Sequence, residues 1–188
     1  HVLQMTGLYV AQMAPSSFIT NCANFGAADE MRRIQRIAYW TKVLANAHGD
    51  DLARTPAARS AWEEATSWQA ARKVLEKLLI AYDWGEAFAA RNLIIKPALD
   101  RILNNQFGEL ARRNGDEFLA TLFAEFARDS HRSEEWSMAL VKYALERKPE
   151  LRQVLHGWIA TWQPETDEAI KGLAGLFEQA PVPFKASD

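Results

Sequence analysis

Apolar residues recur every three or four positions along almost the whole chain. This is the spacing of one face of an α-helix. Alternating runs of β-branched residues, which indicate strands, are nearly absent. The pattern therefore predicts an all-α fold, with helices over residues 1–14, 16–47, 55–62, 68–82, 84–113, 116–147, 149–162 and 164–179.

Prolines set several of the predicted helix boundaries. Pro149 and Pro164 are each placed at the start of a helix, because proline fits the first helical turn. Pro97 lies inside the 84–113 helix, removes one backbone hydrogen bond and is predicted to kink that helix. The helical pattern is already under way at Val2 without a capping residue, so we expect the chain to be a piece of a longer protein.

The three longest predicted helices and the first one are the parts of a four-helix bundle, with shorter helices around it. Loops are short except for one long crossover over residues 50–82. Residues 1–188 contain no linker or low-complexity segment, so we expect one helical domain.

Composition narrows the function classes. The net charge of -2 gives no basic patch for nucleic acid, and no apolar run is long enough for a membrane span. Hydrophobic residues make up 48% of the chain, which argues against disorder. A single cysteine, Cys22, excludes an internal disulfide framework and favours a cytoplasmic location.

The motif Asp-x-x-Arg occurs twice, as Asp29 to Arg32 and as Asp129 to Arg132. Each copy lies on one of the long predicted helices. If the helices face each other, the two motifs can exchange charge-assisted hydrogen bonds across the bundle. Next to the first copy we expect an apolar stripe of Ala27, Met31, Ile34 and Ala38.

The inward stripe of the 116–147 helix is interrupted by three serines. Serine is a poor core residue, so these positions indicate either a close helix contact, with hydroxyls bonded to the preceding turn, or sites that once held larger polar ligands. The stripe alone favours the first interpretation. Its members are Leu119, Leu122, Phe126, Ser130, Ser133, Ser137, Leu140 and Ala144.

Metal and nucleophile signatures are weak. None of the four histidines follows an acidic residue by three positions, as a di-iron bundle requires. His131 precedes Glu134 and Glu135, which favours a surface ion pair. Helical spacing places a set of aromatic and aliphatic residues in the core: Trp84, Phe88, Ile95, Leu99 and Ile102. Three further tryptophans are expected to lie partly exposed, on a face that meets a partner: Trp40, Trp62 and Trp136.

Several stretches together resemble a known family. The chain is similar to the beta subunit of the hydroxylase component of bacterial multicomponent di-iron monooxygenases, in the branch that oxidises toluene, other aromatic compounds or alkenes. Family beta subunits carry a further N-terminal region. The resemblance covers essentially the whole chain and is most specific at Gln12-Met13-Ala14-Pro15 and Asp83-Trp84-Gly85-Glu86-Ala87-Phe88.

The resemblance implies a ferritin-like bundle whose iron ligands are lost. In that comparison Leu8 replaces one ligand Glu, Arg33 replaces a His beside the retained Glu30, and Ser130 and Ser133 replace a Glu and a His. The remaining carboxylate falls near Gly85 or Glu86. The resemblance therefore implies no catalytic, cofactor-binding or metal-binding residue here, and a polar centre that pairs Glu30, Arg33, Asp129 and Arg132.

The resemblance also implies a function within a complex. This chain would be a non-catalytic subunit that packs against an alpha subunit, which holds the di-iron centre, in a dimer of heterotrimers with gamma. The complex would use O2 and electrons from NADH, delivered by a reductase and a ferredoxin, together with an effector protein. No nucleic acid or membrane is expected as a partner.

Two other functions remain open. The first is an active di-iron enzyme with an altered ligand set of Glu30, Glu86, His131 and Glu134. The second is a helical ligand-binding regulator that contacts DNA through residues 32–36, although this basic segment lies in the middle of a predicted helix.

Overall fold

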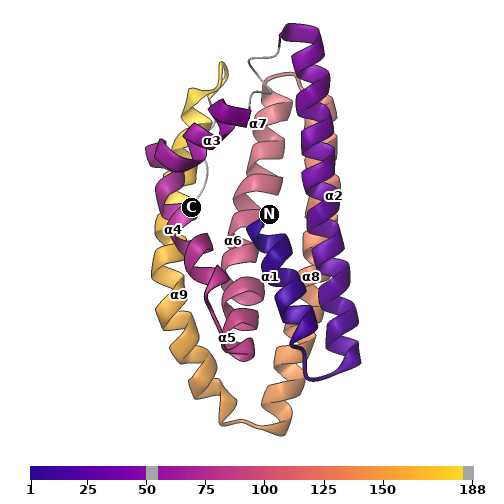
Figure 1. Cartoon of the computed structure of the whole chain (residues 1–188), viewed down its shortest axis with the longest axis vertical. Helices are drawn as coiled ribbons and strands as arrows, with labels where there is room; N and C mark the ends of the chain where they lie inside the picture. Colours follow the sequence, from indigo (N-terminus) through magenta and orange to yellow (C-terminus); the bar gives the residue numbers. More distant parts are fainter. Residues whose placement is uncertain (50–54, 184–188) are drawn as a thin grey trace.

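The computed structural model describes residues 1–49 and 55–183. All regular structure in these ranges is helical. Figure 1 shows a central column of helical segments with other helices on both sides of it. The helices are α1 (Val2–Gln12), α2 (Ser17–His48), α3 (Thr55–Glu64), α4 (Thr66–Leu79), α5 (Trp84–Phe88), α6 (Lys96–Asp100), α7 (Phe107–Arg113), α8 (Glu117–Arg147) and α9 (Leu151–Ala174).

The helix ends follow from capping chemistry. The hydroxyl of Ser16 accepts a hydrogen bond from the Ile19 amide, and α2 ends before Gly49, which has a φ of 107°. The carboxylate of Asp116 accepts from the Leu119 amide at 2.8 Å and begins α8. The boundaries expected for these two helices are therefore confirmed to within a few residues.

The central column is one uninterrupted run of helix from α5 to α7. Two of its segments are π-helical, η2 (Ala89–Ile95) and η3 (Arg101–Gln106), and they flank α6. The predicted interruption at Pro97 takes the form of these wide turns on both sides of the proline. Such turns are frequent at functional sites.

One sequence prediction about the last helices is wrong. Residues 149–162 and 164–179 do not form two helices, because α9 runs through Pro164 to Ala174 and is followed by a short 3₁₀ helix, η4 (Gly175–Gln179). A proline inside a helix removes one hydrogen bond and crowds the carbonyl four residues before it, at a cost of about 3 kcal/mol. On either side of it the helix buries Trp162, Ala169 and Leu173 against the rest of the core, which holds it together.

The central column has two buried faces of different chemistry. Toward α4 and α9 it buries apolar residues, with Ile95, Leu99 and Ile102 packed among side chains of these two helices. The core predicted around Phe88 and these three residues is confirmed. The opposite face of the column meets α2 and α8 (Figure 1). This second face carries the candidate site.

The apolar stripe predicted on α2 is wrong in part. Met31 is 37% exposed and Ala38 is exposed, whereas Ala27 is buried. The inward face of α2 continues instead through Glu30, because this helix turns a charged side chain toward the column. The observed fold is all-α and ferritin-like, as expected.

Candidate functional site

Four polar residues of the central column line the face that meets α2 and α8. They are Asn92, Lys96, Asp100 and Asn104, spaced four apart, and each is at most 5% exposed. In an ideal α-helix, residues four apart drift around the axis by about 40° at each step. The π-helical turns of η2 and η3 hold extra residues and reduce this drift. The polar row therefore stays on one face.

The middle of this row forms a closed set of buried ion pairs with α2. The Lys96 ammonium lies 2.8 Å from Glu30 and also contacts Asp100. The Arg33 guanidinium lies 2.9 Å from Asp100 and 3.3 Å from Glu30. Each cation touches both carboxylates, so two positive and two negative charges cancel. We call these four residues the charged centre.

The ion pairs of the charged centre shift the pKa values of Asp100 and Arg33. Burial alone would raise the pKa of Asp100, but Lys96 and Arg33 outweigh it and the pKa is lowered. Burial would lower the pKa of Arg33, but Asp100 and Glu30 raise it. Both shifts favour the charged form of these two side chains.

Amide and hydroxyl groups extend the charged centre along α8. Asn104 donates a hydrogen bond to the Ser130 hydroxyl, and Asn92 donates one to the Ser137 hydroxyl, both at 2.9 Å. The same hydroxyls donate to the carbonyls of Phe126 and Ser133. For Ser130 and Ser137, the interpretation as a close helix contact with hydroxyls bonded to the preceding turn is confirmed.

Arg91 ties α1 to the column. Its guanidinium is 1% exposed and donates two hydrogen bonds to the carbonyl of Leu3, at 2.9 and 3.0 Å, and one to the Asn92 side chain. Burial lowers the pKa of Arg91. An added Cβ at Gly7 would lie 2.8 Å from this guanidinium, so the glycine makes room for the charge.

The two Asp-x-x-Arg motifs do exchange contacts between α2 and α8. Arg32 donates to Asp129, and Arg132 donates to Asp29 at 2.8 Å and to Asp129 at 3.0 Å. The side chains of Arg32 and Arg132 are 50% and 59% exposed, so this quartet lies at the surface. The hydrogen bonds raise the pKa of both arginines.

The network expected from Glu30, Arg33, Asp129 and Arg132 is therefore wrong as one unit. Asp129 and Arg132 belong to the surface quartet. Glu30 and Arg33 instead pair with Lys96 and Asp100. The difference arises because the central column supplies a second cation and a second carboxylate between α2 and α8.

The altered ligand set proposed from the sequence does not come together. His131 has a side chain 72% exposed and pairs with Glu135 at 3.5 Å, which confirms the expected surface pair. Glu86 accepts a hydrogen bond from the indole nitrogen of Trp162, and Glu134 is exposed. Within residues 1–49 and 55–183, no three His, Cys, Asp or Glu residues form a group that could hold a metal.

The charged centre does not fit a pair of iron ions. A di-iron bundle takes a Glu from each of two helices and a Glu-x-x-His from each of two others. Here Glu30 and Asp100 are both bound by cations, and the positive charges of Lys96 and Arg33 would repel a metal ion at close range. Leu8 does not lie at this centre, because its side chain is 44% exposed.

The sequence interpretation missed the polar residues of the central column. Lys96 and Asp100 lie among core residues, and the helix was interpreted through its apolar spacing alone. A signal was present, since Asn92, Lys96, Asp100 and Asn104 recur at intervals of four and alternate with apolar residues. That spacing indicates a second buried face.

These features define a class of protein, a ferritin-like helical bundle whose polar centre is filled by its own ion pairs. A family model described as methane/phenol/alkene hydroxylase matches residues 1–148, and the chain belongs to this family. In the described part of the chain, no helix is both long and apolar enough to cross a membrane.

Individual relatives agree with this family. The chain is 37% identical over 183 residues to the hydroxylase component subunit beta of the toluene-4-monooxygenase system of Ectopseudomonas mendocina, which covers 97% of this chain and 55% of that protein. It is 27% identical to the hydroxylase component small subunit of propane 2-monooxygenase from Mycolicibacterium goodii, over 89% of this chain and 46% of that protein. The chain thus spans about half the length of these relatives.

A solved structure supports the same relationship. The fold matches a chain from a structure of toluene 4-monooxygenase with toluene bound in its resting active site. The match has a TM-score of 0.88 and 38% identity, and covers 94% of this chain and 58% of that chain. The homologous proteins are hydroxylase components of monooxygenase systems.

Proposed function

We propose that this chain is a non-catalytic, metal-free structural subunit of a hydroxylase, equivalent to the beta subunit. The observation that carries the proposal is the charged centre, in which Lys96 and Arg33 use both carboxylates of Glu30 and Asp100. Its residues join α2 to the central column, and the surface quartet joins α2 to α8. The bundle centre then serves to hold helices in place.

In this proposal the oxidation reaction takes place in a partner subunit. An alpha subunit holds the di-iron centre, and the two subunits form a dimer of heterotrimers with gamma. The complex oxidises aromatic hydrocarbons or alkenes with O2 and NADH-derived electrons, delivered by a reductase and a ferredoxin, and an effector protein acts on it. The toluene and phenol monooxygenases among the relatives support an aromatic substrate, whereas the propane monooxygenases are named for an alkane. We propose a cytoplasmic location.

The geometry gives the two other functions less support. An altered di-iron site would need Glu86 and His131 beside Glu30, but Glu86 bonds Trp162 and His131 lies on the surface. A DNA-binding segment at residues 32–36 would need free basic side chains at a recognition helix. In the structure Arg32 pairs with Asp129 of α8 and Arg33 pairs with Asp100 of α6.

Metal analysis of the full-length subunit, alone and co-purified with its alpha and gamma partners, tests the proposal. We expect the complex to contain two irons for each alpha subunit and the isolated chain to contain no stoichiometric iron. The Glu30→Gln variant of this chain should leave the iron content of the complex unchanged. Stoichiometric iron in the isolated chain that is lost in Glu30→Gln would overturn the proposal.

A further inference from the structure

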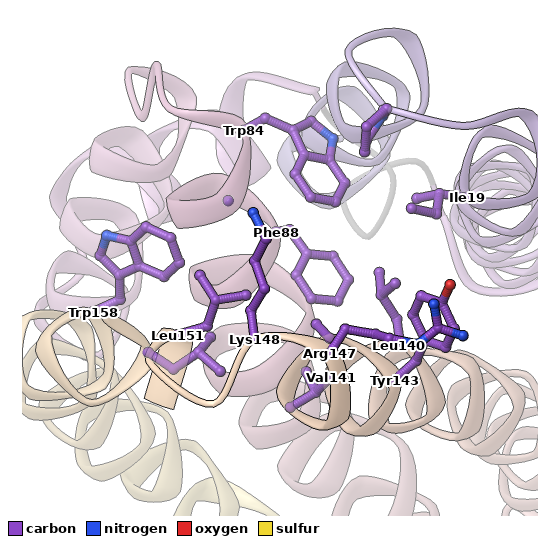
Figure 2. A pocket seen from close by; sticks show the side chains of 14 residues that line it. Ile19, Trp84, Phe88, Leu140, Val141, Tyr143, Arg147, Lys148, Leu151 and Trp158 are labelled. Carbon is purple, nitrogen blue, oxygen red and sulfur yellow. The ribbon is translucent and has the colours of Figure 1, made fainter. Parts of the chain in front are cut away.

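A second feature lies away from the charged centre, at the end of the bundle where α8 turns into α9. A cavity of about 400 Å³ opens there between α5, the last turns of α8 and the first turns of α9. Figure 2 shows aromatic and aliphatic side chains around it, including Trp84, Phe88 and Trp158. Its volume falls in the range of small-molecule sites.

The walls of this cavity are fixed by contacts within the chain. The indole nitrogen of Trp84 donates to the carbonyl of Val10 at 2.8 Å, so its one polar atom is already used. Its ring stacks on Phe88 at 5.5 Å between centroids. Trp158 packs against Gly85, where an added Cβ would lie 2.7 Å from the indole. The cavity is therefore preformed, and it does not depend on an outside group to shape it.

The chemistry of the lining selects its occupant. The walls are almost wholly apolar, and the charged groups among the lining residues are Arg147 and Lys148 at the end of α8. Arg147 lies over the ring of Tyr143 at 4.7 Å. Such a lining disfavours a cation and offers no buried partner to a polar group. A dry apolar cavity of about 150 Å³ is enough for benzene in another protein.

We propose that this cavity is a binding site for a compact neutral hydrocarbon of the size of a monocyclic aromatic. The identity of the ligand rests on the proposed function, because the complex would oxidise molecules of this class. The cavity would hold substrate on the non-catalytic subunit. Rigid aromatic walls on three elements favour a small molecule over a partner side chain, which would have to match a shape already set.

Crystallography with bromobenzene tests this site. Crystals of the co-purified hydroxylase complex, or of the full-length subunit if no complex forms, are soaked and the bromine is located by anomalous scattering. We expect bromine density between Trp84 and Trp158. A cavity that stays empty, that holds a side chain of another subunit, or that holds a long acyl chain which bromobenzene does not displace would overturn the inference.

Variants of α8 test the site in solution. Ala144 is a half-buried lining residue, so Ala144→Phe fills the cavity, while Ala139→Phe adds the same ring on the exposed face of the same helix. Titration with fluorobenzene followed by ¹⁹F NMR should show binding whose affinity falls by at least about tenfold in Ala144→Phe. Ala139→Phe should bind fluorobenzene with the wild-type affinity. Equal binding by both variants would contradict the site.

The two proposals fail in different ways. If the chain does not co-purify with hydroxylase subunits, the proposed function fails, and the soaked full-length subunit still reports on the cavity. If the complex forms but bromobenzene is found only outside this subunit, the cavity proposal fails and the structural role stands.

Discussion

At the scale of single residues, the charged centre depends on two cations with different shapes. The forked guanidinium of Arg33 reaches Asp100 and Glu30 at once, whereas the Lys96 ammonium acts as a compact charge between the same two carboxylates. All four side chains are 13% exposed or less. Loss of one partner would leave a buried charge without compensation, which is the costly case for an ion pair in a protein interior.

Lys96→Met should therefore lower the free energy of unfolding by about 3–5 kcal/mol, because Glu30 and Asp100 would face each other with only Arg33 between them. Urea denaturation followed by circular dichroism measures the change. Lys73→Met, whose side chain is 73% exposed on α4, is the matched control and should change it by less than about 0.5 kcal/mol. A similar small effect at both positions would show that the centre contributes little to stability.

Asp100 makes the stability depend on pH. Its pKa is lowered in the folded protein, because Lys96 and Arg33 outweigh the effect of burial. A carboxyl group whose folded pKa lies below its unfolded value of about 3.9 adds stability above that pH, and this stability is lost as the pH falls through the folded pKa. The free energy difference between wild type and Asp100→Asn should be largest above about pH 5 and shrink below about pH 4.

Urea unfolding of both proteins across this pH range measures the difference. Glu134→Gln, at an exposed position, serves as the control and should differ from wild type by less than about 0.5 kcal/mol. A wild-type advantage over Asp100→Asn that persists or grows in acid would show that Asp100 is not ionised in the folded protein.

Part of this site could be predicted from single residues and part could not. The His131–Glu135 pair is visible in the sequence because helical spacing places its partner, and the repeated Asp-x-x-Arg motif indicated the contacts between α2 and α8. The pairing of Arg33 with Asp100 is not visible, because it joins two helices and no repeated motif marks Asp100 as a partner. Only the packing of the column against α2 brings these groups together.

At the scale of elements, the central column is the unusual part. A helix with one buried face can follow ordinary α-helical spacing, but this one is buried on two faces of opposite chemistry. The polar row needs a period of four, and the π-helical turns supply it. Apolar spacing predicted the extent of this helix correctly. The wide turns were not predicted, since they arise from packing on both sides.

Two glycines give a matched test of how α1 and α2 pack. Gly7→Ala should destabilise the protein by about 1–3 kcal/mol, because the new methyl group would displace the Arg91 guanidinium from the carbonyl of Leu3. Gly26→Ala, where an added Cβ meets nothing within 4 Å, should stabilise α2 by about 0.5–1 kcal/mol. Thermal unfolding of the two variants shows whether each substitution raises or lowers the stability of the protein. The same sign for both would show that the Arg91 contact does not restrict α1.

At the scale of the whole molecule, charge lies inside the bundle while large apolar side chains remain outside it. On α2, Phe18, Phe25 and Tyr39 are 82%, 71% and 67% exposed. Their spacings of 7 and 14 place them on one line along the helix. Single exposed apolar residues are common in proteins, but a row of aromatic side chains on one face is typical of a surface that binds another protein.

Phe25→Ser should therefore weaken assembly with the alpha and gamma subunits while leaving the stability of the chain within about 0.5 kcal/mol of wild type. Burial of a Phe side chain contributes about 1.5–3 kcal/mol, so the dissociation constant should rise by about tenfold or more. Ile80→Ser is the matched control, because Ile80 is 80% exposed but lies at the end of α4 and outside the aromatic row of α2. Sedimentation of the mixed subunits measures both constants. Weakening by Ile80→Ser alone would place the interface on the α4 side, and the aromatic row of α2 would then need another explanation.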